Sequence, residues 1–217
     1  MTAVDVVVLT WNDDPAMLDV ALDSALEQQS CAVRLFVVDN GSAPPAVVAD
    51  ERAHVLRQDE NLGVGGGRNV GARAGAAPFV CFLDSDARLH DGALAALLAP
   101  MIADAAVGLT APVFTGQRPE ASGGRRPTLR RKMARALNRT DLYEPTPGQG
   151  VGTSWDVDFC LRIRQAGWRV LQVASGGCDH PPRRAFKGLA SARGLRHSAA
   201  VVRHLWRHRA RSSAAVR

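Results

Sequence analysis

The stretch Phe79 to Asp86 constrains the fold of this chain more than any other. Five apolar residues run directly into a pair of carboxylates, Asp84 and Asp86. A short, continuous apolar run is typical of a strand buried on both faces, as in the middle of a parallel sheet, and Pro78 suits the start of such a strand. Ligands of an open α/β sheet bind where its strands end at their carboxyl edge. The pattern therefore predicts an α/β fold with both carboxylates at that edge.

The two carboxylates are spaced to share one hard cation. Residues two apart in an extended chain point the same way, so Asp84 and Asp86 can bind one divalent ion and leave its other positions to phosphate and water. The alternative is a solvated loop after a core strand, which is the commoner outcome for a lone Asp-x-Asp. The remaining motifs decide between the two.

Strands and helices alternate through the first half of the chain. Strands are expected at residues 4–10, 34–38, 54–57 and 79–83. Asp13 or Asp14 can cap a helix that has Pro15 at its first position, and His90 or Asp91 can open another. Alternation at this spacing predicts a parallel sheet with helices on both faces.

Residues 61–75 are rich in glycine but match no nucleotide-binding fingerprint. The dinucleotide pattern fails because Arg68 stands where a glycine is needed, and because the segment follows the third predicted strand rather than the first. We expect a loop whose bare backbone lets a ligand or another strand approach closely. A tight turn is the alternative.

The cysteines and the apolar segments indicate in which cellular compartment the chain is expected. Four scattered cysteines without a Cys-x-x-Cys pair argue against a zinc site or a disulfide framework and suit a reducing compartment. Asp5 interrupts the first apolar run, so no signal peptide is expected, and no window reaches the length of a membrane-spanning helix. A cytoplasmic location is expected, with attachment to the inner face of the membrane as an option.

The basic charge is concentrated in the tail. Residues 183–217 hold ten Lys or Arg and no acid; since the whole chain carries +6, residues 1–182 carry −4. We therefore expect one domain at 1–182 and a basic, helical tail at 183–217. The tail suits an anionic membrane surface, and its alternative is a solvated helix docked on the domain. Nucleic acid is not expected as a partner, because no recognised binding motif is present and the main body is acidic.

An ordered set of motifs closely resembles family 2 glycosyltransferases with the GT-A fold, especially their bacterial rhamnosyltransferase-like branch. The motifs are Leu9–Asn12, Val37–Ser42, Glu60–Gly71, Phe82–Ala87, Ser122–Thr128, Asp156–Arg162, Ala166–Val170 and His180. The resemblance spans most of residues 4–182. It implies an α/β GT-A nucleotide-diphospho-sugar transferase fold, which is a Rossmann-like, mostly parallel central sheet flanked by helices.

The resemblance also implies an activity. A family 2 hexosyltransferase of this kind moves a sugar from a UDP- or dTDP-sugar to a hydroxyl acceptor with inversion, assisted by Mn²⁺ or Mg²⁺, in cell-surface polysaccharide or glycoconjugate synthesis. The acceptor would be a glycan, a lipid-linked glycan or a small molecule. UDP and dTDP present the same edge to a protein carboxylate, so the choice between them stays open.

Residue roles follow from the resemblance. Asp39 would accept the N3–H of the pyrimidine, with an Asx-turn to Gly41 as the alternative. Arg68 and Asn69 would approach the nucleotide from the glycine loop; the alternative is a helix start with Asn69 merely exposed. The full nucleotide-sugar set is Thr10, Asn12, Asp39, Asn40, Ser42, Asn61, Gly63, Arg68, Asn69 and Asp84.

The metal and catalytic roles follow in the same way. Asp86 would bind the cation directly, Asp84 would hold the ribose or reach the cation through water, and His180 would be a further ligand, although a lone histidine is usually a surface or packed residue. Asp156 would be the catalytic base, in the first turn of a helix capped by Ser154 and closed by Gly167.

Two departures from the family pattern leave a second function open. Trp155 stands where the family usually has Glu, and only eleven residues separate Tyr143 from Trp155, where the family has a longer stretch. A nucleotide-sugar-binding relative that has lost turnover is therefore the alternative function. A nucleotidyltransferase ranks lower, because no glycine-rich loop ending in Arg or Lys follows the first strand.

Overall fold

The computed structural model describes residues 1–114 and 155–180. The chain divides into two compact units, Met1–Thr115 with Leu171–Pro181, and Gly116–Val170 with Pro182–Arg217. Several predicted features lie outside the described residues, namely the basic loop at 122–128, the Ser154 cap, the gap after Tyr143 and the tail at 183–217. No helix in the part of the chain that the structure describes is long and apolar enough to cross a membrane.

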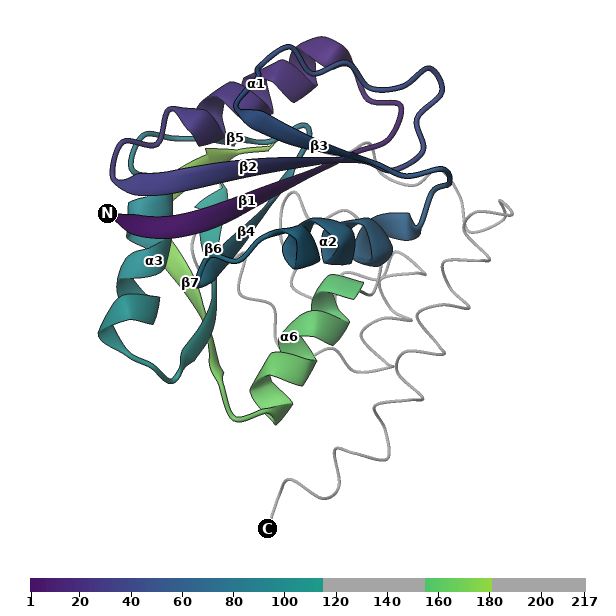
Figure 1. Ribbon diagram of the computed structural model, residues 1–217. Helices are drawn as coiled ribbons and strands as arrows, with labels where there is room; N and C mark the ends of the chain where they lie inside the picture. The colour runs from purple at the N-terminus through teal and green to yellow at the C-terminus, as the bar shows by residue number, and fades with distance from the viewer. Residues whose placement is uncertain (115–154, 181–217) are drawn as a thin grey trace, which may run out of the picture. The chain divides into compact units, whose positions relative to one another are not determined.

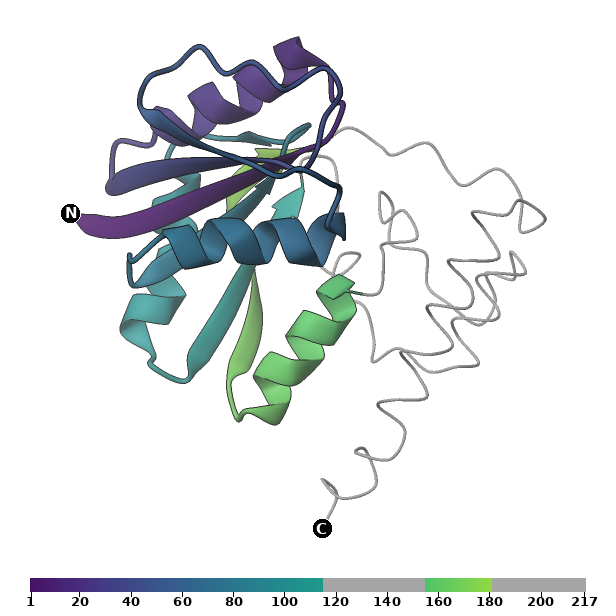
Figure 2. The same cartoon turned by 45° about the vertical axis from the view of Figure 1, so that its right-hand side comes forward.

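The first unit is built on a four-stranded sheet in the order β3-β2-β1-β4 (Figure 1). Its strands are parallel and run over β1 (Thr2–Thr10), β2 (Cys31–Asp39), β3 (Ala53–Arg57) and β4 (Phe79–Asp84). Helices α1 (Pro15–Leu26) and α2 (Gly63–Ala74) lie on opposite faces of this sheet (Figure 2). The four predicted strands and the α/β class are confirmed.

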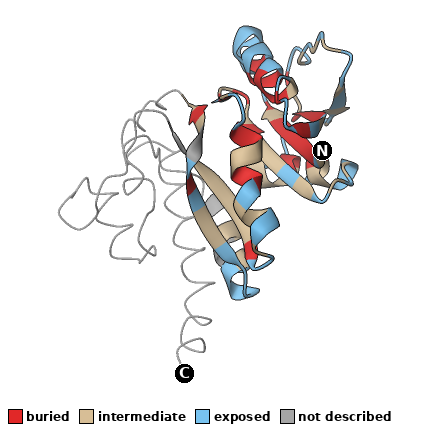
Figure 3. Ribbon diagram, turned by 90° about the vertical axis from the view of Figure 1, so that its left-hand side faces the viewer, coloured by how far each residue is buried: buried red, intermediate tan, exposed pale blue. Residues whose placement is uncertain are grey.

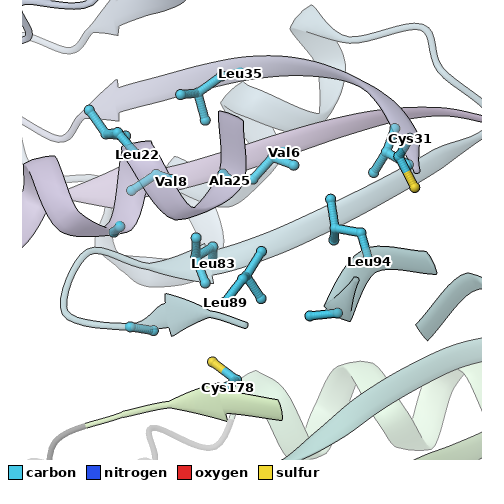
Figure 4. Packing of buried hydrophobic residues seen from close by; sticks show 14 of the residues in the cluster. Val6, Val8, Leu22, Ala25, Cys31, Leu35, Leu83, Leu89, Leu94 and Cys178 are labelled. Atoms are coloured by element: carbon cyan, nitrogen blue, oxygen red, sulfur yellow. The ribbon is translucent and has the colours of Figure 1, made fainter. Parts of the chain in front are cut away.

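Helix α1 begins as the sequence predicts. Asp14 is its N-cap, and the Asp14 carboxylate accepts a hydrogen bond from the Ala16 N–H at 2.9 Å, while Pro15 takes the first helical position. Leu18, Ala21, Leu22 and Ala25 then pack against Val4, Val6 and Val8 of β1. Figure 4 shows Val6, Val8, Leu22 and Ala25 together in this cluster, and Figure 3 shows the buried positions along the sheet.

Strand β4 is not the middle of the sheet, so the prediction that it is buried on both faces is wrong. Among the described strands it pairs in this sheet only with β1, Val80 is 46% exposed, and only Leu83 is buried within it. The interior strands of this sheet are β2 and β1. Val4, Val6 and Val8 of β1 pack in the core under α1, and Val7 packs in a second core under α2. An apolar run alone does not distinguish a central strand from an edge one.

The glycine-rich stretch forms helix α2 rather than the predicted loop. Glycines are required because α2 packs very closely on β1: a Cβ at Gly67 would overlap Leu9, one at Gly71 would overlap Val7, and one at Gly75 would overlap the Asp5 carboxylate. These pairs step four residues along α2 and two residues back along β1, so the helix runs antiparallel to the strand. The expectation that another strand approaches this backbone is confirmed.

A second, three-stranded sheet has the order β5-β7-β6. It comprises β5 (Arg88–Leu89), β6 (Val107–Phe114) and β7 (Arg169–Asp179), and β5 pairs with β7 in antiparallel register. Helix α3 (Ala93–Ala103) begins after Gly92, one to two residues later than predicted, and packs on β6. None of these three strands was predicted. His180 follows directly after β7 and belongs to the first unit.

Helix α6 (Trp155–Gln165) belongs to the second unit and ends at the predicted residue. Gly167 has a φ of 91°. Its N–H donates to the Arg164 carbonyl at 3.1 Å, and the Trp168 N–H donates to the Ile163 carbonyl at 3.2 Å. This pair of hydrogen bonds is a Schellman motif, in which a left-handed glycine satisfies the last carbonyls of the helix.

Candidate active site

The loops after β1 and β2 are joined to each other by reciprocal hydrogen bonds. The Asn12 N–H donates to Ser42 Oγ at 2.9 Å, and the Ala43 N–H donates to Asn12 Oδ1 at 2.8 Å. Asn12 has a φ of 53°, in the left-handed region that asparagine tolerates better than most residues. Thr10 Oγ1 donates to Asp13 Oδ2 at 3.1 Å. The predicted ligands Thr10, Asn12 and Ser42 therefore lie together at the carboxyl edge.

Asp39 is surrounded by protein donors. Its side chain is 1% exposed, and it accepts hydrogen bonds from the N–H of Ser42 at 2.9 Å and of Ala46 at 3.0 Å, and pairs with Arg57. Burial raises the pKa of this carboxyl, but the hydrogen bonds from Ser42 and Ala46 and the charge of Arg57 outweigh it and lower the pKa overall. The predicted alternative, a turn closed by the carboxylate, is present but closes on Ser42 rather than Gly41. The contact of Asp39 with the pyrimidine stays a prediction, because the pyrimidine N3–H would share this carboxylate with Ser42, Ala46 and Arg57.

Asn40 is buried and its amide bonds within the protein; its predicted contact with the nucleotide-sugar stays a prediction. The residue is 2% exposed, and its amide is engaged at both ends: Nδ2 donates to Asn61 Oδ1 at 2.9 Å and Oδ1 accepts from the Leu62 N–H at 3.0 Å. Asn61 Oδ1 also accepts from the Gly63 N–H at 2.8 Å. Asn40 therefore positions the start of α2, and Asn61, Leu62 and Gly63 are all exposed in this turn.

Arg68 reaches the acidic pair from α2 rather than from a loop, which corrects its predicted setting. It is 9% exposed, pairs with Asp84, and places its guanidinium carbon 5.4 Å from the centroid of the Phe82 ring. Asn69, the next residue, is exposed on the helix. Both residues lie within helix α2, and their contact with the nucleotide stays a prediction.

Asp84, Asp86 and His180 converge, although 96 residues separate the first from the last. His180 Nε2 lies 3.3 Å from Asp84 Oδ2 and 3.2 Å from Asp86 Oδ1, and the three potential ligand atoms are within 4.8 Å of one another. Hydrogen bonds to Asp84 and then Asp86 raise the pKa of His180 to about 9. Two carboxylates and an imidazole form a donor set that fits Mn²⁺ or Mg²⁺.

Two residues near the site were missed or misassigned. Asp13 was considered only as a helix cap, yet it accepts from Ser85 Oγ at 2.6 Å and so joins the loop after β1 to the Asp-Ser-Asp segment. Arg57 was not considered. It is the register partner of Asp39 in the parallel pairing of β2 and β3, so an explicit alignment of the strand ends would have found it.

Asp156 lies in the first turn of α6, in the second unit. Its place in a helix start is as predicted, and its role as a base stays a prediction.

Comparisons with known proteins identify the family. The model of glycosyl transferase family 2 matches residues 5–154, which is more than half of the chain. The chain belongs to glycosyl transferase family 2. Among curated relatives, the succinoglycan biosynthesis protein ExoO of Rhizobium meliloti (strain 1021) is 42% identical over 71 residues, covering 30% of this chain and 20% of ExoO.

Solved structures confirm the GT-A fold of this family 2 glycosyltransferase. The mannosyltransferase PcManGT from Pyrobaculum calidifontis, in complex with GDP-Man and Mn²⁺, matches with a TM-score of 0.59 at 18% identity, over 99% of this chain and 65% of that one. GalNAc-T7 with UDP, GalNAc and Mn²⁺ matches with a TM-score of 0.59 at 16% identity, over 93% of this chain and 48% of that one. The chain thus spans a fifth of the length of its curated relative and less than two thirds of each solved structure.

Proposed function

We propose that this chain transfers a sugar from a pyrimidine nucleotide-sugar to a hydroxyl acceptor, with inversion and with the help of Mn²⁺ or Mg²⁺. The observation that carries the proposal is the convergence of Asp84, Asp86 and His180 at the carboxyl edge of the sheet. Family 2 membership and the GT-A fold support it. The two solved relatives hold Mn²⁺ with a GDP-sugar or with UDP, so the pyrimidine preference is inferred here from Asp39 alone.

Each residue has a defined task in this proposal. Asp86 and His180 would hold the cation directly and Asp84 would orient the ribose or a water on the cation; the cation would offset the charge that builds on the leaving diphosphate. Thr10, Asn12, Ser42 and Asp39 would frame the base and ribose. Asp156 would take the proton of the acceptor hydroxyl as it attacks the anomeric carbon, and a single displacement of this kind inverts that carbon.

The finer assignments are proposals as well. Residues 122–128 and 156–162 favour the rhamnosyltransferase-like branch, and the match to a succinoglycan biosynthesis protein favours a role in cell-surface polysaccharide synthesis. The basic segment 183–217 would form a tail separate from a domain at 1–182 and hold the enzyme at an anionic membrane surface, near a lipid-linked acceptor.

A second candidate function is donor binding without turnover. Trp155 in place of an acidic residue and the short segment between Tyr143 and Trp155 favour it. The two functions differ in one measurement, since only the enzyme transfers the sugar or slowly hydrolyses the donor.

The proposal is tested by calorimetric titration with UDP, dTDP and GDP, each with and without Mn²⁺ or Mg²⁺. We expect UDP or dTDP to bind more tightly when the cation is present. The Asp86→Ala variant should lose this cation dependence, whereas Asp91→Ala, which removes an exposed carboxylate outside the site, should keep it. Equal cation-assisted affinity in Asp86→Ala and the parent would contradict the metal assignment, and GDP binding as tightly as UDP would contradict the pyrimidine assignment.

A further inference from the structure

The position of Arg68 is fixed from three sides. Its guanidinium pairs with Asp84 and lies over the ring of Phe82. Its backbone is held close to β1, because Gly67 and Gly71 allow α2 to approach Leu9 and Val7 without an intervening Cβ. At 9% exposure, this is not a mobile surface arginine. The structure therefore places a permanent positive charge beside the acidic pair.

The arginine also limits what Asp84 can do. Oδ1 of Asp84 pairs with Arg68, while Oδ2 lies 3.3 Å from His180 Nε2. Arg68 therefore holds Oδ1, whereas Oδ2 contacts the same imidazole nitrogen that would bind the cation. If His180 binds the cation through Nε2, its contact with Oδ2 of Asp84 is lost, and only Oδ1 of Asp84 is withheld from the cation by Arg68. Asp86 contacts His180 Nε2 through Oδ1 at 3.2 Å.

A fixed positive charge next to a metal site has opposite effects on the binding of the metal ion and of the nucleotide diphosphate. It repels a divalent ion that binds alone, because like charges at short range in a partly desolvated site repel strongly. It attracts a diphosphate, which brings its own negative charge. Once the diphosphate is present, the repulsion between Arg68 and the metal ion is compensated.

We propose that Arg68 is a positioning residue that holds Oδ1 of Asp84 away from the cation and makes tight cation binding depend on the nucleotide diphosphate. This inference rests on the proposed function. The inference adds an order of events to the proposed function: the metal ion is retained only together with the donor, and it is released readily once the nucleotide leaves.

The test measures Mn²⁺ affinity with and without saturating UDP or GDP, by the signal of free Mn²⁺ in electron paramagnetic resonance. Arg68→Met keeps the length and apolar stem of the side chain and removes its charge; Arg68→Lys keeps the charge. Arg73→Met is the matched control, because Arg73 is an exposed residue on the same helix and its loss changes the net charge equally. Arg68→Gln is a second neutral variant in case Arg68→Met does not fold, which circular dichroism reports.

We expect Arg68→Met to bind Mn²⁺ alone about tenfold more tightly than the parent, the order expected for losing one partly screened unit charge near a divalent ion. The factor by which nucleotide improves Mn²⁺ binding should fall correspondingly. Arg68→Lys and Arg73→Met should stay within about twofold of the parent. A merely structural role predicts the opposite, since a loosened site binds Mn²⁺ more weakly.

The inference is overturned if folded Arg68→Met or Arg68→Gln binds Mn²⁺ alone no more tightly than Arg73→Met. It is also overturned if the gain from nucleotide is the same in the parent and in the neutral variants. A parent that binds neither Mn²⁺ nor nucleotide, alone or together, would instead overturn the proposed function itself, so the two failures are distinguishable.

Discussion

A pair of Gly→Ala variants in one helix tests the close packing of α2 on β1. A Cβ at Gly71 would lie 3.0 Å from Cγ2 of Val7 and 3.1 Å from Cγ2 of Val38, with Cγ1 of Val7 closer still. Valine side chains are stiff about χ1, so the strand or the helix must shift, and such overpacking typically costs about 1–3 kcal/mol. Gly65, in the same helix, has nothing within 4 Å of the added atom.

The two variants share the helix-forming gain of Gly→Ala, about 0.5–1 kcal/mol. Gly65→Ala should therefore be more stable than the parent by roughly this amount, and the difference between Gly65→Ala and Gly71→Ala isolates the clash, about 1–3 kcal/mol. This corresponds to roughly 2–12 °C in Tm for a chain of this size. Gly67→Ala should fall between them, because the atom it meets is the flexible end of Leu9.

The assay is thermal and urea unfolding followed by circular dichroism, under one buffer condition for all variants. Equal stability of Gly71→Ala and Gly65→Ala would refute the argument that α2 is glycine-rich because of its contact with β1. A loss of stability in Gly65→Ala would show that another factor controls this helix.

Three further predictions concern chemistry and charge. Asp156→Asn should lower the turnover number by about 10²–10⁴, the usual worth of a general base, and leave donor affinity nearly unchanged; full sugar transfer by the variant would assign the base elsewhere. The raised pKa of His180, about 9, stabilises the metal-free fold fully below its ordinary pKa near 6.5. The free energy of unfolding should therefore decrease as the pH rises through 9 in the parent but not in His180→Ala, and parallel pH curves would contradict this. Deleting residues 183–217 should abolish salt-sensitive co-sedimentation with anionic vesicles without abolishing nucleotide binding, and parent protein that stays unbound at low salt would disprove the membrane role.

The first half of the fold was predictable because its signals are local. Asp14 and Pro15 define the start of α1, and the apolar runs define four strands whose carboxyl ends must share an edge. That argument also placed Asp84 and Asp86 correctly. A local signal does not say which strands lie beside a given strand. It therefore predicts β4 as an interior strand, although β2 and β1 are the interior strands and β4 lies at the edge of this sheet.

The features around the site that the sequence does not predict have the same origin. A run of glycines favours a loop by local propensity, and the reason for helix α2 is the surface of Leu9 and Val7 on another element. The pairing of Asp39 with Arg57 depends on strand register. The burial of Asn40 depends on the turn into α2 that its own amide stabilises. Each of these features is a contact between two segments that are distant in the sequence, so the residues of one segment alone do not predict it.

The adjacency of β6 and β7 has a consequence for how such a chain can diversify. β6 ends at Phe114, β7 begins at Arg169, and the two strands are neighbours in one sheet. The end of β7 is also paired with β5, because Arg88 faces Asp179 and Leu89 faces Cys178, and doubling the length of a flexible connection costs only about 0.6 kcal/mol. Changes of length between β6 and α6, within residues 115–154, are therefore expected to leave the end of β7, and with it His180, beside Asp84 and Asp86.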